Sequence, residues 1–397
     1  MAAERLAIVA GLIRATRDFD LAEDCLQDAV ERALERWPRD GIPSNPAAWL
    51  ATTARRRALD VLRRRHLERA KLEELQTMID FGATPPGDAE AFGDDRLKLL
   101  FTCCHPALPA AGRVALTLKV VTGLSTREVA RAFLVTEATM SQRLLRTKAK
   151  IVEAGIAFRV PEPHRLAERT AGVLAVVYLL FNEGYSATEG PALRPDLAAE
   201  AIRLAGLLAE LLPDDAEARS LHALLLLQHS RRDARLDPGG ELLTMEEQDR
   251  GRWDHEAIAA GLDSLQRARA TSRGEASGSY RIQAEIAALH ATAATPADTD
   301  WDSIVRGYDI LLATPNNVVA LNRAVAIGYR DGPQAGLAAL DGLDLPGYHL
   351  LPAARADLLR RAGRPAEAAA AYREALELVR TDEERRLIAR RLAALEG

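Results

Sequence analysis

The sequence contains few cysteines and no long apolar run. Its 397 residues include three cysteines, two of them adjacent, which excludes a framework of disulfides. The longest apolar run, residues 173–181, is far shorter than the roughly 20 residues that a membrane-spanning helix needs. Residues 1–14 lack the basic start, apolar core and cleavage site of a signal peptide. We therefore expect a cytoplasmic protein with no membrane segment.

Lysine is absent from residues 161–397, and this part of the chain is acidic. It carries 27 arginines against 36 acidic residues, whereas residues 1–160 carry 25 lysines and arginines against 21 acidic residues. Two parts of opposite net charge indicate different partners. The basic part is expected to bind an anionic partner, and the acidic part is not expected to bind nucleic acid.

Alternating β-strand patterns are also missing, and the chain is predicted to be all-α. Ala, Leu, Arg and Glu dominate, and apolar residues recur at spacings of three and four. The helical patterns break near residues 37–46, 81–95, 159–163 and 236–240, and the second break has the Gly- and Pro-rich composition of a flexible linker. We expect helical domains at 1–70 and 95–158, a linker at 71–94, and a helical extension at 164–397.

The extension is predicted to contain repeated helix pairs. They can be placed at 214–230 with 254–270, 279–293 with 301–313, 316–329 with 333–340, and 348–362 with 365–379. The second helices of the last two pairs begin 32 residues apart, at Pro333 and Pro365. This spacing resembles the tetratricopeptide repeat (TPR), a unit of about 34 residues. For residues 164–300 an irregular helical bundle is an equally good interpretation.

Residues 123–151 have the pattern of a helix-turn-helix. Ser125 or Thr126 can cap a first helix, Leu134 and Val135 form the turn, and Thr136 can cap a second helix. The positions expected to face the core are Val129, Ala130, Phe133, Met140, Leu144 and Leu145.

The second helix of this motif leaves a basic face outward. This face carries Thr139, Ser141, Gln142, Arg143, Arg146, Lys148 and Lys150. Arginine and glutamine can read base edges in the major groove, while hydroxyls and lysines hold phosphates. The alternative is an ordinary amphipathic hairpin with a solvated basic face.

A basic helix follows an acidic one earlier in the chain. Residues 18–40 hold eight acidic residues against three arginines, and residues 51–71 hold eight basic residues against two acidic ones. So many arginines favour phosphate contact. An acidic helix beside a basic one suits a protein contact next to a DNA contact. The expected apolar faces are Leu21, Cys25, Leu26, Ala29, Val30 and Ala33 on the first helix, and Trp49, Leu50, Ala54, Ala58, Val61 and Leu62 on the second.

The order of these segments resembles regions 2 and 4 of the extracytoplasmic-function (ECF) group of sigma-70 factors. The resemblance rests on DLAEDCLQDAVERAL, on NPAAWLATTARRRALDVLRR, on the spacer and on the helix-turn-helix. It implies docking on core RNA polymerase, at the β′ clamp helices and the β flap, with candidate residues Ala22, Glu23, Asp24, Gln27, Asp28 and Glu31. It implies binding of the −10 promoter element through Trp49, Arg55, Arg56, Arg57, Arg63 and Arg64. It implies binding of the −35 element through Thr126, Thr139, Ser141, Gln142, Arg143, Arg146 and Lys148.

Two positions depart from the family pattern. Arg56 stands where Asn is usual, and Leu134 stands where the turn of region 4 usually has Gly. The promoter sequence therefore cannot be carried over from the family. The strings LLFTCCHPAL, YLLFNEGY, ALLLLQHSRRDAR and QDRGRWD resemble an ECF subgroup that has a long C-terminal TPR-like extension.

Three polar clusters allow other interpretations. Cys103, Cys104 and His105 suggest a metal, but adjacent helical side chains point about 100° apart, so buried thiols and no metal site are expected. His222 and His229 are expected to be core histidines. The string around residues 231–235 is interpreted as an internal ion-pair cluster, and a functional surface is the alternative. Its members are Arg231, Arg232, Asp233 and Arg235, with Glu183 or Asp249 as candidate partners.

No nucleophile–base pattern, Gly-rich phosphate loop or HExxH motif is present, so neither an enzyme nor a cofactor is expected. The sequence predicts an alternative sigma factor that binds core RNA polymerase and promoter DNA, with an extension that regulates activity or binds a regulatory protein. One alternative is a DNA-binding regulator with a helical sensor domain that acts without polymerase. Another is a TPR scaffold whose N-terminal half has lost activity.

Overall fold

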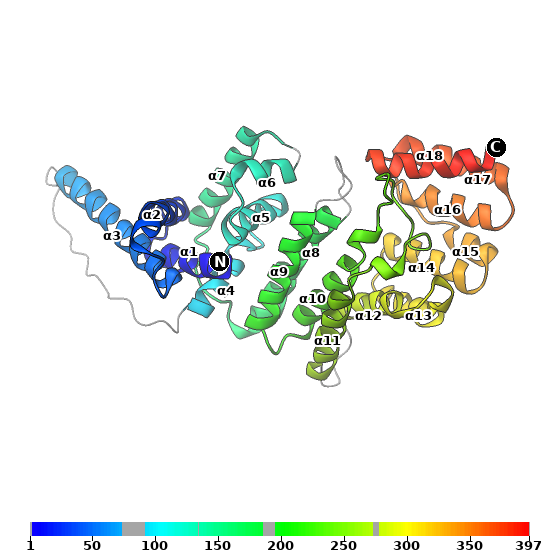
Figure 1. Ribbon diagram of the computed structural model, residues 1–397, viewed down its shortest axis with the longest axis horizontal. Helices are drawn as coiled ribbons and strands as arrows, with labels where there is room; N and C mark the ends of the chain where they lie inside the picture. The colour runs from blue at the N-terminus through cyan, green and yellow to red at the C-terminus, as the bar shows by residue number, and fades with distance from the viewer. Residues whose placement is uncertain (1, 74–91, 134, 186–194, 273–277, 397) are drawn as a thin grey trace. The chain divides into compact units, whose positions relative to one another are not determined.

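The architecture was obtained from a computed structural model, which describes residues 2–73, 92–133, 135–185, 195–272 and 278–396. These residues form helices, and the described ranges contain no β-strand, only an isolated bridge between Leu236 and Leu242 (Figure 1). The predicted all-α class is confirmed. None of the described helices is long and apolar enough to cross a membrane. The chain divides into two units, Met1–Val176 and Val177–Gly397.

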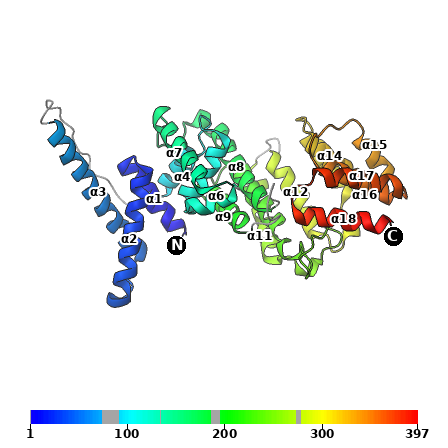
Figure 2. The same cartoon turned by 90° about the horizontal axis from the view of Figure 1, so that it is seen from above.

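The first unit is built around its N-terminal helix. The helix α1 packs against α2, α3, α4 and the π-helical segment η2 through a face that includes Leu6, Val9 and Ile13 (Figures 1 and 2). The helices of this unit are α1 (Ala2–Thr16), α2 (Phe19–Asp40), α3 (Pro46–Glu73), α4 (Phe92–Cys103), α5 (Ala110–Leu116), η2 (Thr117–Thr122), α6 (Thr126–Ala132) and α7 (Glu137–Glu153). The linker expected at 71–94 lies mostly on residues 74–91, which are outside the described residues, as is Leu134.

Local capping explains where three of these helices begin. Asp18 accepts hydrogen bonds from the backbone N–H groups of Asp20 and Leu21 at the start of α2. Ser125 forms a reciprocal capping box with Glu128 at the start of α6. The Thr136 hydroxyl accepts from the backbone N–H of Thr139 at the start of α7, as predicted. The helix-turn-helix is therefore specified by residues that lie within it.

The boundary between the units falls inside α8 (Pro163–Tyr185), later than the expected start of the extension at residue 164. The first half of α8 belongs with the first unit because the guanidinium of Arg169 donates a hydrogen bond to the carbonyl oxygen of Phe101 on α4, at 2.7 Å. Val173 and Leu174 on the same half are buried.

The second unit consists of helices packed in sequence order. The four expected helix pairs are present, and α9 and α18 add to them. The elements are α9 (Pro195–Leu211), α10 (Ala216–His229), η3 (Arg232–Ala234), η4 (Arg250–Arg252), α11 (His255–Thr271), α12 (Ser279–Thr292), η5 (Pro296–Asp298), α13 (Trp301–Leu311), α14 (Asn317–Arg330), α15 (Pro333–Leu340), α16 (Leu350–Arg361), α17 (Pro365–Leu378) and α18 (Asp382–Glu396). Tyr372, on α17, is buried in a core that also contains Ala356 and Leu359 of α16 and Ile388 of α18.

Gly336 on α15 allows this helix to approach α14 closely. A Cβ atom at Gly336 would lie 2.8 Å from the Cα of Gly328 and 3.0 Å from the carbonyl oxygen of Ala324, both on α14. Backbone atoms cannot move aside as a flexible side chain can, so Gly336→Ala is expected to lower the free energy of unfolding by about 1–3 kcal/mol. Urea unfolding followed by circular dichroism measures this. Gln334→Ala, at an exposed position of the same helix, should change it by less than about 0.5 kcal/mol, and equal effects would contradict the packing described here.

Candidate nucleic-acid interface

The acidic helix α2 exposes part of the face that the sequence predicts to bind protein. Asp24, Gln27 and Glu31 are exposed, and Gln27 donates to Glu31 across one turn. Ala22 is fully buried, because it belongs to the apolar stripe that packs α2 into the unit. Its side chain is therefore not available to a partner in this arrangement. Val30, expected in the stripe, is instead 41% exposed.

Asp28 and Arg57 are engaged with each other. The Nε of Arg57 on α3 lies 2.7 Å from an Oδ of Asp28 on α2. Sequence reasoning assigned Arg57 to DNA and Asp28 to polymerase, whereas the structure places them in one ion pair that joins the two helices. For Arg57 to bind DNA or Asp28 to bind polymerase, this ion pair would have to break.

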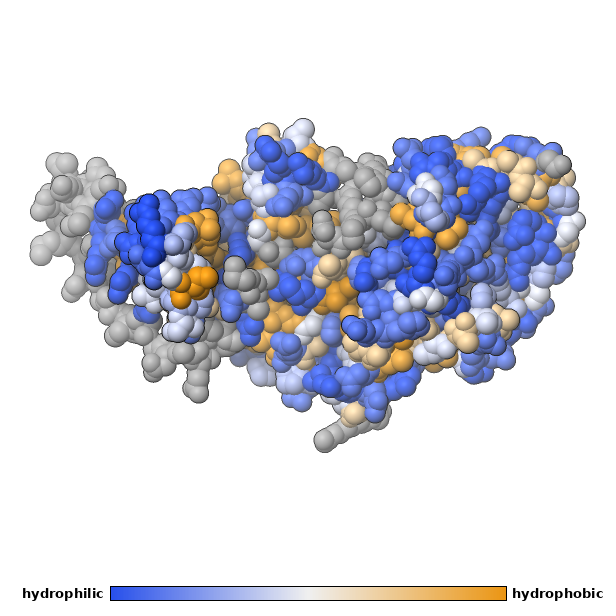
Figure 3. All heavy atoms as spheres, viewed as in Figure 1, coloured by the Kyte–Doolittle hydropathy of each residue, from blue (hydrophilic) through white to orange (hydrophobic). Residues whose placement is uncertain are grey.

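The remaining arginines of α3 lie on its exposed surface. Arg55, Arg56, Arg63 and Arg64 are exposed, and none has an ion pair with another described residue. Trp49, at the start of the helix, is half-buried and packs edge-on against Trp37 of α2, with ring centroids 5.6 Å apart. Hydrophilic residues predominate over α2 and α3 on the face shown in Figure 3. The surface of α3 thus presents unpaired positive charge, as a phosphate-binding helix requires.

Four of the predicted −35 residues gather in one hollow beside α7. Thr139, Gln142, Arg143 and Arg146 line it together with Lys150, and its volume is about 440 Å³. The Thr139 hydroxyl is shared with the cap, at 2.9 Å from that of Thr136. The other members, Thr126, Ser141 and Lys148, do not line this hollow.

Arg143 and Arg146 differ in how they are held. The guanidinium carbon of Arg143 lies 5.1 Å from the centroid of the Phe133 ring, which orients the side chain by a cation–π contact. Arg146 is exposed and makes no hydrogen bond or ion pair with any described residue. The side chain of Arg146 is therefore free to contact a base.

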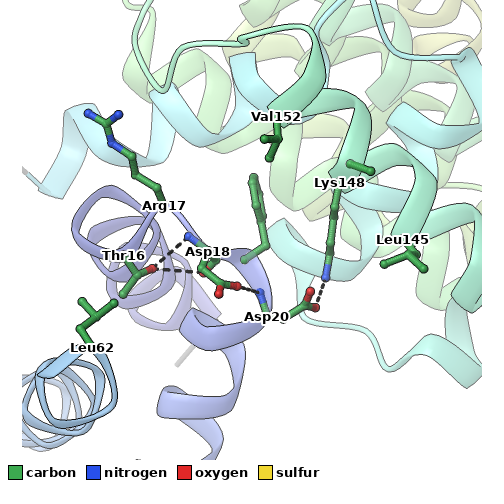
Figure 4. Close-up of a pocket in the computed structure, with 10 residues that line it drawn as sticks. Thr16, Arg17, Asp18, Asp20, Leu62, Leu145, Lys148 and Val152 are labelled. Atoms are coloured by element: carbon green, nitrogen blue, oxygen red, sulfur yellow. Dashed lines mark hydrogen bonds and ion pairs between the residues drawn. The ribbon is translucent and has the colours of Figure 1, made fainter. Parts of the chain in front are cut away.

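Lys148 points away from the hollow and binds the start of α2. Figure 4 shows it reaching Asp20, with its Nζ 2.5 Å from an Oδ, across a cleft of about 690 Å³. Leu145 and Val152 line the same cleft. The prediction that Leu145 faces the core is wrong, since its side chain is 65% exposed. Its neighbour Leu144 fills the core position, and the next residue along a helix points about 100° away.

A second ion pair between distant segments involves the predicted polymerase-binding face of α2. The Nζ of Lys119, in η2, lies 3.5 Å from an Oε of Glu23, and the Glu23 side chain is only 14% exposed. The other Oε of Glu23 is buried without a hydrogen-bond partner among the described residues. Sequence reasoning missed Lys119, because a pair separated by so many residues leaves no local pattern. In this arrangement Glu23 cannot meet a partner unless the two segments separate.

Lys119→Ala is therefore expected to raise the affinity for core RNA polymerase. Removing one partly exposed ion pair should favour separation by a factor of about two to five. Titration of fluorescently labelled full-length chain with purified core enzyme, without DNA, measures the effect. Lys150→Ala is the matched control, because Lys150 pairs with Glu153 on its own helix. Equal affinities for all three proteins would show that the Lys119–Glu23 pair does not compete with docking.

The adjacent cysteines are buried, as expected. Cys103 and Cys104 are at most 2% exposed, and the Sγ of Cys104 lies 3.4 Å from the Thr117 hydroxyl. Burial raises the pKa of Cys103 well above its ordinary value and raises that of Cys104 to about 11. Within the described part of the chain, no group of three potential ligands could hold a metal ion.

These thiols are expected to react slowly. Iodoacetamide needs the thiolate, which is scarce at pH 8 when the pKa is raised, and burial also blocks access. Mass spectrometry should find little alkylation of the native chain after a time that fully labels the three cysteines in urea. Rapid labelling of the native protein would show that the region around Cys103 opens readily.

The charged string of the second unit is only partly the predicted ion-pair cluster. Arg232 pairs with Asp254 at 2.8 Å and with Asp233 at 3.5 Å. Arg231 and Arg235 instead donate to the hydroxyl and the carbonyl oxygen of Tyr185, and the Arg235 guanidinium lies 4.0 Å from the Tyr185 ring centroid. His222 and His229, expected in the core, are only partly buried, and the Nδ1 of His222 lies 3.5 Å from the Ser264 hydroxyl.

Comparison with known proteins identifies both parts of the first unit. The family described as Sigma-70 region 2 matches residues 4–68, and the family described as Sigma-70, region 4 matches residues 98–151. Residues 169–269 match a family described as a family of unknown function (DUF6596). An uncharacterized protein of Rhizobium meliloti (strain 1021) is 46% identical over 375 residues, which cover 92% of this chain and 88% of that protein. No solved structure matches the chain. The chain therefore contains Sigma-70 region 2 and region 4 domains, which support a sigma factor-like role in transcription initiation and imply binding to core RNA polymerase and promoter DNA.

Proposed function

We propose that the protein is an alternative sigma factor of the ECF group that directs promoter-specific initiation. The observation that carries this proposal is the pairing of an acidic exposed face on α2 with an unpaired basic surface on α3, both within region 2. A repressor has no use for the acidic face, whereas a sigma factor needs one surface for polymerase and another for DNA. We assign Asp24, Gln27 and Glu31 to the polymerase contact.

Region 2 would open the −10 element by capturing bases as they unpair. Arg55, Arg56 and Arg63 can neutralise the phosphates, and Trp49 offers an aromatic face on which a base can stack. Melting is then driven by binding energy and needs no catalytic group. Region 4 would fix the duplex at −35 through Gln142 and Arg146. Because both sites sit on one chain, each modest affinity is multiplied through effective concentration.

The second unit is proposed to regulate this activity, in the manner of an ECF factor with a TPR-like extension. Its acidic composition argues against a third DNA contact. Helix pairs stacked in sequence order create the extended surfaces with which repeat proteins bind partners. The partner would be polymerase itself or a regulatory protein.

Transcription in vitro tests the proposal. Purified core polymerase is supplied with full-length chain, or with residues 1–176, on genomic template, and transcript 5′ ends are sequenced. We expect start sites that depend on the full-length chain, and a different yield without Val177–Gly397. Absence of specific transcripts from both proteins would refute the sigma-factor assignment. Identical transcripts from both would refute regulation by the second unit.

The alternative function is a helix-turn-helix regulator that acts without polymerase. The unpaired Arg146 favours it as much as it favours a sigma factor. Binding of core polymerase by the full-length chain, measured without DNA, separates the two functions.

A further inference from the structure

A continuous groove runs through the second unit. Its larger part has a volume of about 1020 Å³ and is lined by the end of α8 and by α10, α12, α13 and α14. A smaller hollow of about 240 Å³ extends it toward Trp301 and Tyr329. Met245, His290 and Tyr308 line both parts, which makes them one surface. None of these residues has a role in the function proposed above.

Two arginines enter this groove without a carboxylate partner. Arg231 and Arg250 both approach the Trp253 ring, with guanidinium carbons 6.0 and 4.6 Å from its centroid, and both act electrostatically on His290. Neither makes an ion pair with a carboxylate of any described residue, and Asp298, which acts electrostatically on Arg250, lies beyond ion-pair distance. Glu246, the acidic residue on the wall of the smaller hollow, hydrogen-bonds to Tyr329.

The contacts that these arginines do make leave donors free. Arg250 donates one Nη to the carbonyl oxygens of His290 and Ala293, at 2.8 and 2.6 Å, and closes the end of α12. Its Nε is buried with no hydrogen-bond partner in the described ranges. Among the residues that the structure describes, Arg231 donates a hydrogen bond only to the Tyr185 hydroxyl. A guanidinium has five N–H donors, so both side chains retain the capacity to bind an anion.

The pKa of His290 is lowered partly by the positive charges of Arg231 and Arg250 in the groove. Its Nδ1 is buried and has no partner among the described residues. Burial, and then the charges of Arg231 and Arg250, lower its pKa to about 4. Like charges gathered in a partly buried site are costly unless an anion joins them. The acidic composition of the surrounding unit makes this concentration of positive charge more distinctive.

The walls of the groove carry two amides that are also free. Gln228 on α10 and Asn322 on α14 line it, and neither makes a hydrogen bond to a described residue. A side-chain amide offers a donor and an acceptor, which match the N–H and C=O groups of an extended peptide. The volume of the larger part is at the upper end of the range for small-molecule pockets.

We propose that this groove binds an extended acidic peptide, whose carboxylate lies between Arg231 and Arg250 and whose main chain pairs with Gln228 and Asn322. The proposal goes beyond the function proposed above and does not depend on it, because every residue involved lies in Val177–Gly397. Three strings noted in the sequence, which contain Tyr185, Gln228 with Arg231, and Arg250 with Trp253, meet here.

A peptide selection tests this proposal. A phage library of random dodecapeptides is selected on immobilised full-length chain, and enriched peptides are synthesised with a fluorescein label for anisotropy. We expect the enriched peptides to be rich in Asp and Glu. Arg231→Gln should weaken their binding by about 10- to 100-fold, the cost of a charge-assisted hydrogen bond. Arg252→Gln, at an exposed arginine that does not line the groove, should change it by less than about twofold.

A second variant keeps the test valid if Arg231→Gln disturbs folding. Asn322 is exposed and makes no hydrogen bond to a described residue, so Asn322→Ala should keep the thermal midpoint of the protein and weaken peptide binding about fivefold. Selection of peptides without acidic residues, or binding unchanged by both variants, would overturn the proposal. Competition by free glutarate as strong as by the peptide would also overturn it, since the site would then take small carboxylic acids.

Discussion

Arg146→Ala is expected to reduce transcription from the chain's own promoters by about 5- to 100-fold. One bidentate contact between arginine and a guanine edge discriminates by about 1–3 kcal/mol. Arg146 is exposed on α7, lines the hollow with Gln142, and makes no contact with a described residue that the substitution would remove. Transcription in vitro with core polymerase on the start sites mapped from genomic template measures the loss.

Two companion variants make the interpretation specific. Arg159→Ala removes an exposed arginine that pairs with Glu162 beyond the end of α7, and should leave transcription unchanged. Lys150→Ala should weaken binding at all promoters alike and reduce its dependence on salt, as loss of a phosphate contact does. If Arg146→Ala left yields and start sites unchanged, the −35 contact would have to lie elsewhere on region 4.

The parts of the site that could be predicted from sequence are those determined by near neighbours. The caps at Ser125 and Thr136 each involve a residue three positions on, so the spacing of residue types is sufficient to find them. The same holds for the all-α class, because the helical period is visible in any window of two or three turns.

What could not be predicted depends on contacts between distant segments. Nothing near Glu23 indicates Lys119, and nothing near Asp20 indicates Lys148, although these pairs decide which residues are free. Ala22 was assigned by resemblance to a motif, and a motif does not separate the residues that fold a helix from those that meet a partner. Leu145 was misplaced because adjacent leucines fit the apolar stripe equally well by pattern.

The contacts of Arg231 and Arg250 in the second unit also could not be predicted from sequence, because they join distant segments. In sequence, Arg231 stands two residues before Asp233, and an ion-pair cluster within this string is the simplest expectation. In the structure the segment from η3 to η4 brings Arg231 and Arg250 to one tryptophan, and the acidic side chain goes elsewhere. The unpaired charge arises from this convergence of distant segments, which local pattern cannot report.

The double variant Asp24→Arg with Glu31→Arg is expected to weaken binding to core polymerase by at least about 100-fold. The two carboxylates are two turns apart on the exposed face of α2, and juxtaposed like charges at an interface cost several kcal/mol. The fold should survive, because the buried stripe with Leu21, Cys25 and Ala29 is untouched. Titration of labelled variant with purified core enzyme measures the affinity, and thermal unfolding verifies the fold.

This variant also separates the two candidate functions, because it leaves α7 unaltered. Glu162→Arg makes one such reversal of charge at an exposed position outside α2 and should bind core polymerase normally. A sigma factor with the double reversal would lose transcription because it no longer joins the polymerase, although its −35 helix still presents Arg146. If the protein is instead a regulator that acts without polymerase, the double variant would bind its DNA sites as before. Neither the natural chain nor the double variant would then bind the core enzyme. Unchanged core affinity in the double variant would move the polymerase contact away from α2 and would leave the acidic face without a role.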